Sequence, residues 1–160
     1  ALQNLTAAFA NTIADFVFGA DDKTIYFTAS ESIYEPIFRL TVASRKIEKI
    51  VPAVNASSLR LAPNGKSLVY LVQNVAMPHE LFSFDLRSRT QAQLTRTNQE
   101  LLKDVEMNRA ETFRFQGAKD EIVGGMLLKP PFFDAAKKYP LVFLVHGGPQ
   151  GGGTDDFHYR

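Results

Sequence analysis

The feature that most constrains the fold is an internal repeat of about 44 residues in the first hundred positions. Residues 16–29 align with residues 59–72, and the Ser-Arg pair at 44–45 recurs at 88–89. Each copy predicts four short strands, because apolar residues alternate with polar ones and turn residues interrupt the alternation. A unit of four strands every roughly 40–50 residues is typical of β-propeller blades, which stack on their neighbours around a ring.

The turns and the strand ends recur as well. In the turn at 62–66 an Asn-Gly pair is expected to supply the positive φ that a tight hairpin needs. Closing strands are predicted to end at 5–6, 50–51 and 94–95, with spacings of 45 and then 44 residues. A β-sandwich with similar hairpins is the alternative, but the registered copies favour a propeller. Since two blades cannot close a ring, further blades are expected to precede this chain.

The pattern changes after the second copy. Residues 96–109 show no strand alternation and predict an irregular or briefly helical connector. Residues 111–116 predict a strand with one buried face, and residues 121–129 predict a second strand. The glycine pair at 124–125 inside that second strand indicates a bulge or a close backbone contact.

The segment Tyr139–Gln150, YPLVFLVHGGPQ, carries the strongest functional signal. Its five apolar residues, 141–145, predict a strand buried on both faces. The run ends at residues 146–148, His-Gly-Gly, where the lack of a Cβ lets a backbone N–H approach a ligand closely. In α/β-hydrolases such a turn donates one oxyanion-hole N–H to the negative oxygen of a tetrahedral intermediate.

The fold predicted from these features is a set of all-β propeller blades followed by the N-terminal strands of an α/β-hydrolase domain. Residues 1–103 are expected to form the last two blades of the propeller. Residues 104–160 are expected to begin the hydrolase domain and to stop before its nucleophile, because the sequence contains no G-x-S-x-G elbow. The triad would therefore lie outside this chain.

Composition excludes several classes of function. Hydrophobic residues make up 45% and charged residues 22% of the chain, with a net charge of +1, which gives no electrostatic footprint for nucleic acid or an anionic membrane. The absence of cysteine excludes disulfides, thiolate metal sites and a cysteine nucleophile. No metal site is expected at the three histidines, which lack converging partners. Sequons at Asn4 and Asn55 permit a secreted or periplasmic protein without fixing the compartment.

The chain resembles the prolyl oligopeptidase family of serine peptidases, and within it the acylaminoacyl-peptidase and dipeptidyl-peptidase 5 branch. The resemblance covers essentially the whole chain and rests on GADDKTIYFTASE, LTRTNQELL, EIVGGMLLKPP and YPLVFLVHGGPQGG followed by DDFHYR. It implies a serine exopeptidase that hydrolyses short peptides from the N-terminus through a Ser-Asp-His triad, without a metal or organic cofactor. The implied partners are the peptide substrate, the remainder of the same chain and, in some relatives, further copies of it.

The resemblance also implies roles for single residues. Gly148 would donate the oxyanion-hole N–H, and His146 and Gly147 would support the loop that presents it. Gln150 would shape the rim of the substrate site. His146 is not expected to be the general base, because the order of the triad in this fold is Ser, Asp, His.

Other polar residues carry weaker expectations. Glu31 and Glu35 lie in a predicted blade loop and are candidates to face the amino terminus of a substrate. Residues 155–156, Asp-Asp, are interpreted as a solvated loop, and His79 and His158 as surface residues. Two other functions stay open at this point: a lipase- or esterase-like hydrolase with an HGG loop, and a non-catalytic propeller scaffold that retains a hydrolase remnant.

Overall fold

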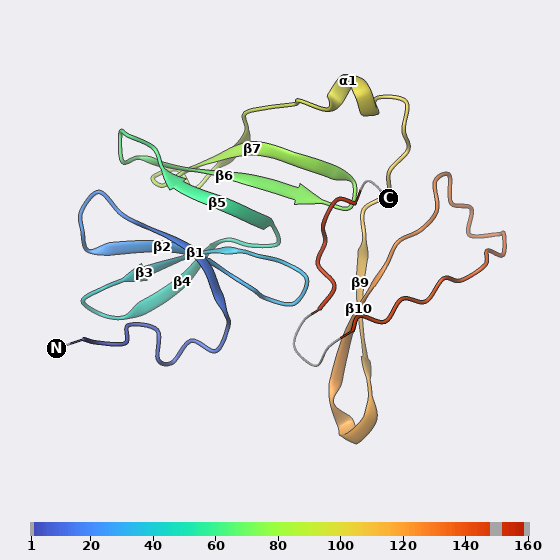
Figure 1. The fold of residues 1–160 in the computed structure, drawn as a ribbon, viewed down its shortest axis with the longest axis horizontal. Coiled ribbons are helices and arrows are strands. Elements are labelled where there is room, and N and C mark those ends of the chain that lie inside the picture. The colour runs from blue at the N-terminus through green and yellow to red at the C-terminus, as the bar shows by residue number, and fades with distance from the viewer. Residues whose placement is uncertain (1, 148–151, 159–160) are drawn as a thin grey trace.

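The computed structural model describes residues 2–147 and 152–158, and antiparallel strands dominate it (Figure 1). Two four-stranded sheets have their strands in chain order. The first contains β1 (Ile13–Phe18), β2 (Thr24–Ala29), β3 (Ile37–Thr41) and β4 (Lys46–Val51). The second contains β5 (Asn55–Leu61), β6 (Ser67–Asn74), β7 (Met77–Asp85) and β8 (Gln91–Gln93). The four-strand unit predicted for each sequence copy is therefore confirmed.

The recurring turn residues share an unusual backbone conformation. Asp22 and Gly65 occupy matching places in the first hairpin of each sheet, with φ of 54° and 68°. Arg45 and Arg89 occupy matching places in the last hairpin, with φ of 55° and 59°. Residues other than glycine seldom adopt positive φ, so the repeat preserves turn geometry at both ends of the unit.

The two sheets pack face to face, and equivalent residues of the repeat point in the same direction. Tyr70 of β6 packs in the cluster between the sheets, whereas its counterpart Phe27 of β2 lies on the far side of the first sheet. Leu68 and its counterpart Ile25 behave in the same way. In a sandwich of two related sheets the equivalent faces would meet. Here opposite faces meet, as in successive blades, which argues against the sandwich alternative.

The far side of the first sheet is covered by the segment that precedes β1. The Phe9 ring lies 5.4 Å from the Phe27 ring and 5.2 Å from the Phe38 ring, both edge-on. Residues 5–8 form a turn, in which the Phe9 N–H donates to the Thr6 carbonyl at 2.9 Å. The closing strand predicted to end at residues 5–6 is wrong, because these residues turn back on themselves and pair with no strand of the described chain.

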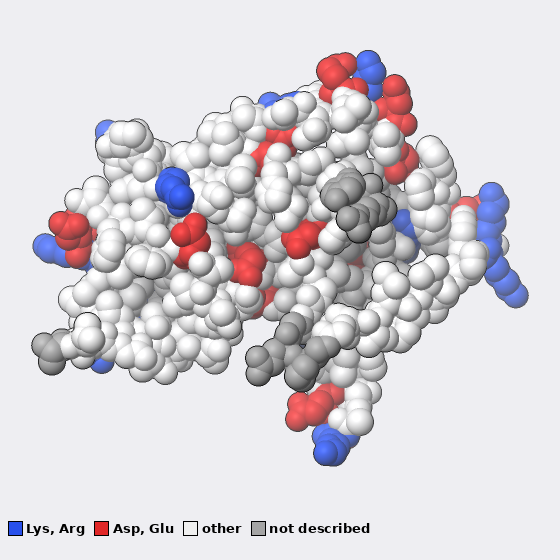
Figure 2. All heavy atoms as spheres, viewed as in Figure 1, with Lys and Arg blue, Asp and Glu red and all other residues white. Residues whose placement is uncertain are grey.

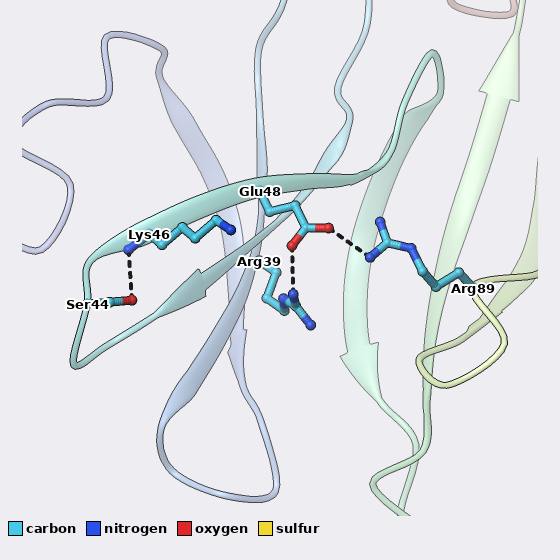
Figure 3. Close-up of polar contacts among 5 residues, drawn as sticks. All are labelled: Arg39, Ser44, Lys46, Glu48 and Arg89. Atoms are coloured by element: carbon cyan, nitrogen blue, oxygen red, sulfur yellow. Dashed lines mark hydrogen bonds and ion pairs between the residues drawn. The ribbon is translucent and has the colours of Figure 1, made fainter.

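Polar contacts also join the two sheets (Figure 3). The Glu48 carboxylate on β4 accepts hydrogen bonds from Arg89 in the β7–β8 turn at 2.7 Å and from Arg39 on β3 at 2.6 Å. These bonds hold the pKa of Glu48 below its usual range. At the β1 edge, the Leu59 N–H donates to Asp15 Oδ2 at 2.9 Å. The interface between the sheets is thus bridged at both edge strands of the first sheet.

A buried carboxylate fixes the chain as it leaves the second sheet. Glu80 on β7 is 4% exposed and accepts hydrogen bonds from the Thr95 hydroxyl and from the Asn98 N–H at 3.2 Å. Burial raises the pKa of Glu80, but the hydrogen bonds together outweigh burial and lower it. The only regular part of the next stretch is α1 (Gln99–Leu102), which confirms the irregular or briefly helical connector.

The hairpin after the connector differs from expectation in two respects. Strand β9 (Glu111–Gln116) pairs with β10 (Ile122–Leu127) across a short 3₁₀ turn, η1 (Ala118–Asp120). All six β9 residues are exposed, so the predicted buried face is wrong within the described chain. The pairing is regular and has no bulge, but a Cβ at Gly125 would lie 2.5 Å from the Phe113 ring. A residue larger than glycine at position 125 would therefore clash with the Phe113 ring.

The predicted buried strand at 141–145 is also wrong in this structure. Its five side chains are 76–86% exposed, and residues 139–147 pair with no strand. A strand buried on both faces needs paired neighbours and covering layers, and the described residues supply neither. The α/β-hydrolase part of the fold consequently stays a prediction. No helix in the described part of the chain is long and apolar enough to cross a membrane.

Candidate oxyanion turn and the segment that follows it

The candidate oxyanion turn is described only in part. Gly148 and Gln150 lie outside the described residues, and their roles stay predictions. His146 and Gly147 are exposed, and His146 Nδ1 lies 3.5 Å from the Gly147 carbonyl oxygen. That separation is at the long limit for a hydrogen bond, which Nδ1 would donate when it carries the proton. The supporting role assigned to the two residues stays a prediction.

Space is open beside Gly147. A Cβ built on this residue would meet no atom of the described chain within 4 Å. A ligand could therefore approach the backbone here without a steric barrier from the described residues.

Residues 152–158, which follow the turn in the sequence, are held against the sheets by Asp155, which is 9% exposed. The Asp155 N–H donates to the Ile33 carbonyl at 3.1 Å, in the β2–β3 loop. Asp155 Oδ1 accepts from the Val75 N–H at 2.9 Å, in the β6–β7 turn, and its carbonyl accepts from Asn55 Nδ2 at 2.7 Å. Figure 1 shows the C-terminal segment beside the β6–β7 turn.

Asp156 adds side-chain contacts to the same place. Its Oδ1 accepts hydrogen bonds from Gln73 Nε2 at 3.0 Å and from Asn55 Nδ2 at 3.2 Å, and its Oδ2 accepts from the Thr154 hydroxyl. The interpretation of residues 155–156 as a solvated loop is therefore wrong. Free backbone groups at the ends of the sheet hairpins need partners, and Asp155 provides them for Ile33 and Val75.

The acidic candidates of the β2–β3 loop have partners of their own. Glu31 forms an ion pair with Lys49, so its charge is already balanced. Glu35 Oε1 accepts from the Ser30 hydroxyl at 2.5 Å, while Oε2 is buried without a partner among the described residues. On the face of the molecule that Figure 2 draws, Asp and Glu side chains lie along the middle, and Lys and Arg side chains lie mainly toward the margins.

The remaining polar residues are placed as follows. His79 on β7 and His158 are both exposed, which confirms their interpretation as surface residues. Asn55 is 6% exposed and donates to the Asp155 segment, so its sequon is not accessible in this structure, whereas Asn4 is exposed. Sequence reasoning missed Asn55 and Asp155 as a linked pair, because their contact spans 100 positions and follows no motif.

The chain is similar in sequence to known peptidases. No family model matches the chain. It is 28% identical to a dipeptidyl-peptidase 5 of Porphyromonas endodontalis over 137 residues, or 86% of this chain and 20% of that protein. It is 32% identical to a dipeptidyl-peptidase 5 of Trichophyton equinum over 148 residues, or 88% and 20%. The chain thus spans about a fifth of the length of these curated relatives.

Solved structures show the same fold. An acylaminoacyl peptidase of Pyrococcus horikoshii superposes with a TM-score of 0.78 at 22% identity, covering 98% of this chain and 24% of that one. A dipeptidyl peptidase 4 of Porphyromonas gingivalis superposes with a TM-score of 0.63 at 16% identity, covering 93% and 22%.

The stacked four-stranded sheets match the propeller-blade region of these two structures. The resemblance to the prolyl oligopeptidase family, in its acylaminoacyl-peptidase and dipeptidyl-peptidase 5 branch, is confirmed.

Proposed function

We propose that this chain is part of a serine exopeptidase that hydrolyses short peptides from the N-terminus. The enzyme would remove dipeptides or acylated amino acids, and its Ser-Asp-His triad would lie outside residues 1–160. The observation that carries the proposal is the continuous similarity to dipeptidyl-peptidases 5 over 86–88% of the chain. The sequence contains the His-Gly-Gly turn but no G-x-S-x-G elbow that would supply the serine of such a triad.

The chemistry follows from the arrangement that the family implies. A serine activated by histidine would attack the peptide carbonyl and form an acyl-enzyme, which water would hydrolyse. The Gly148 N–H and the N–H of the residue after the serine would stabilise the oxyanion. One such donor contributes about 3–4 kcal/mol to transition-state stability. The described chain alone supplies no nucleophile and should not hydrolyse peptides.

A substrate comparison tests the proposal in the full-length protein from which this chain derives. We expect turnover of dipeptidyl or acetyl-aminoacyl chromogenic substrates and covalent labelling by a fluorophosphonate probe. Turnover of short acyl esters alone would favour the lipase- or esterase-like alternative. No turnover together with no labelling would favour a non-catalytic scaffold. Either result would overturn the exopeptidase proposal.

A matched pair of glycine variants tests the role of the turn. A Cβ at Gly147 or at Gly152 meets no atom of the described chain within 4 Å, so valine at either position should cause no clash within the described residues. Because only Gly147 would lie beside the reacting carbonyl, Gly147→Val should lower kcat/KM at least about tenfold, whereas Gly152→Val should change it less than about twofold. Equal effects of the two substitutions, or none, would show that the turn does not border the substrate.

A further inference from the structure

The sequence between the candidate oxyanion turn and Asp155 is rich in glycine. Five of the seven residues at 147–153 are glycine. Glycine loses more conformational freedom on ordering than any other residue, so a fixed contact next to a glycine-rich sequence lowers the entropy that is lost when that sequence becomes ordered.

Asp155 provides an anchor on the other side. Its N–H, its carbonyl and its carboxylate each form a hydrogen bond, to Ile33, Asn55 and Val75 respectively. Ile33 belongs to the first sheet unit, and the other two residues belong to the second. A single residue therefore fastens the segment to both sheets at one end of their interface.

The geometry specifically requires an acceptor at this position. The Val75 N–H lies in the turn between β6 and β7, and Asp155 Oδ1 receives it at 2.9 Å. If this N–H were left without an acceptor, the folded state would lose about 1–3 kcal/mol of stability. Asparagine would retain the acceptor oxygen, whereas alanine would remove it.

We propose that Asp155 is a positioning residue: it anchors residues 152–158 to the two sheets and so helps to place the oxyanion turn that precedes them in the sequence. The catalytic consequence rests on the function proposed above, but the anchoring itself does not. A displacement of about 1 Å at a reacting centre can reduce the rate about 100-fold, so loss of the anchor should appear in kcat.

The test uses the full-length protein with Asp155→Ala, Asp155→Asn and, as a control, Asp104→Ala, which removes an exposed carboxylate in the connector. Steady-state kinetics with a dipeptidyl or acetyl-aminoacyl substrate give kcat and KM. We expect Asp155→Ala to lower kcat roughly 10- to 100-fold with KM changed less than about threefold. Asp155→Asn should retain at least about a third of the wild-type kcat, and the control should match the wild type.

Amide hydrogen exchange gives a second readout that needs no activity. The Val75 and Asp155 amides should be protected in the wild type and should exchange at least about tenfold faster in Asp155→Ala, with little change in Asp155→Asn. Unchanged exchange at both amides would overturn the anchoring. Faster exchange with wild-type kcat would overturn the positioning role. If the wild type hydrolyses no peptide, the proposed function fails, and the exchange result still decides whether Asp155 anchors the segment.

Discussion

Packing between the two sheets gives the sharpest prediction about stability. Leu59 on β5 is fully buried in the cluster that joins them, and its N–H also bonds to Asp15. Leu59→Ala removes three buried carbons and leaves the backbone bond in place. At about 0.8 kcal/mol per buried methylene the loss is about 2.4 kcal/mol, and the residual cavity brings it to about 3–4 kcal/mol.

Native-state hydrogen exchange in the full-length protein measures this loss locally, because a multidomain protein need not unfold in one step. We expect the slowest amides of β6 to exchange roughly 100- to 700-fold faster in Leu59→Ala, since about 1.4 kcal/mol corresponds to tenfold. Leu94→Ala is the control, because Leu94 is 53% exposed and should change the rates less than about threefold. Equal effects of the two substitutions would refute the packing of the sheets through this cluster.

Two further predictions concern the ion pair and the turn. Folding lowers the pKa of Glu48 from its ordinary value of 4.5, so its ion pairs stabilise the folded state fully when the pH is above 4.5. This stabilisation declines as the pH falls from 4.5 toward the lower pKa of the folded state. The unfolding midpoint of Glu48→Gln should therefore lie below that of the wild type near neutral pH and approach it in acid; a constant difference would contradict the ion pair. Gly65→Ala should destabilise the second sheet by roughly 1–2 kcal/mol, because φ is +68° and the new Cβ would lie 2.8 Å from Ala20 Cβ. Gly124→Ala, where a Cβ meets no atom of the described chain within 4 Å, is the control: amides of the second sheet should exchange faster in Gly65→Ala only, and equal effects would contradict the strain at Gly65.

The repeat predicted the two sheets because local rules determine them. Positive φ at Gly65 and Arg89 restricts which residues a turn accepts, and alternation along β6 places Leu68 and Tyr70 on one face. Such signals lie within a few residues of one another, so a sequence displays them directly.

The same rules failed where a segment depends on distant partners. The apolar run at 141–145 has the composition of a buried strand, but burial requires neighbouring strands that the described residues do not contain. Residues 155–156 have the composition of a solvated loop, yet hairpin ends far away in sequence hold them. Neither outcome follows from local pattern, because the decisive contacts are made by the rest of the fold.

The most direct test of the central claim is a crystal structure of the full-length protein with a peptide-like inhibitor bound covalently to its nucleophile. We expect the amide nitrogen of Gly148 to lie about 2.7–3.1 Å from the inhibitor oxygen that represents the oxyanion. An amide bonded to another protein group, or directed away from that oxygen, would contradict the assignment of this turn to catalysis.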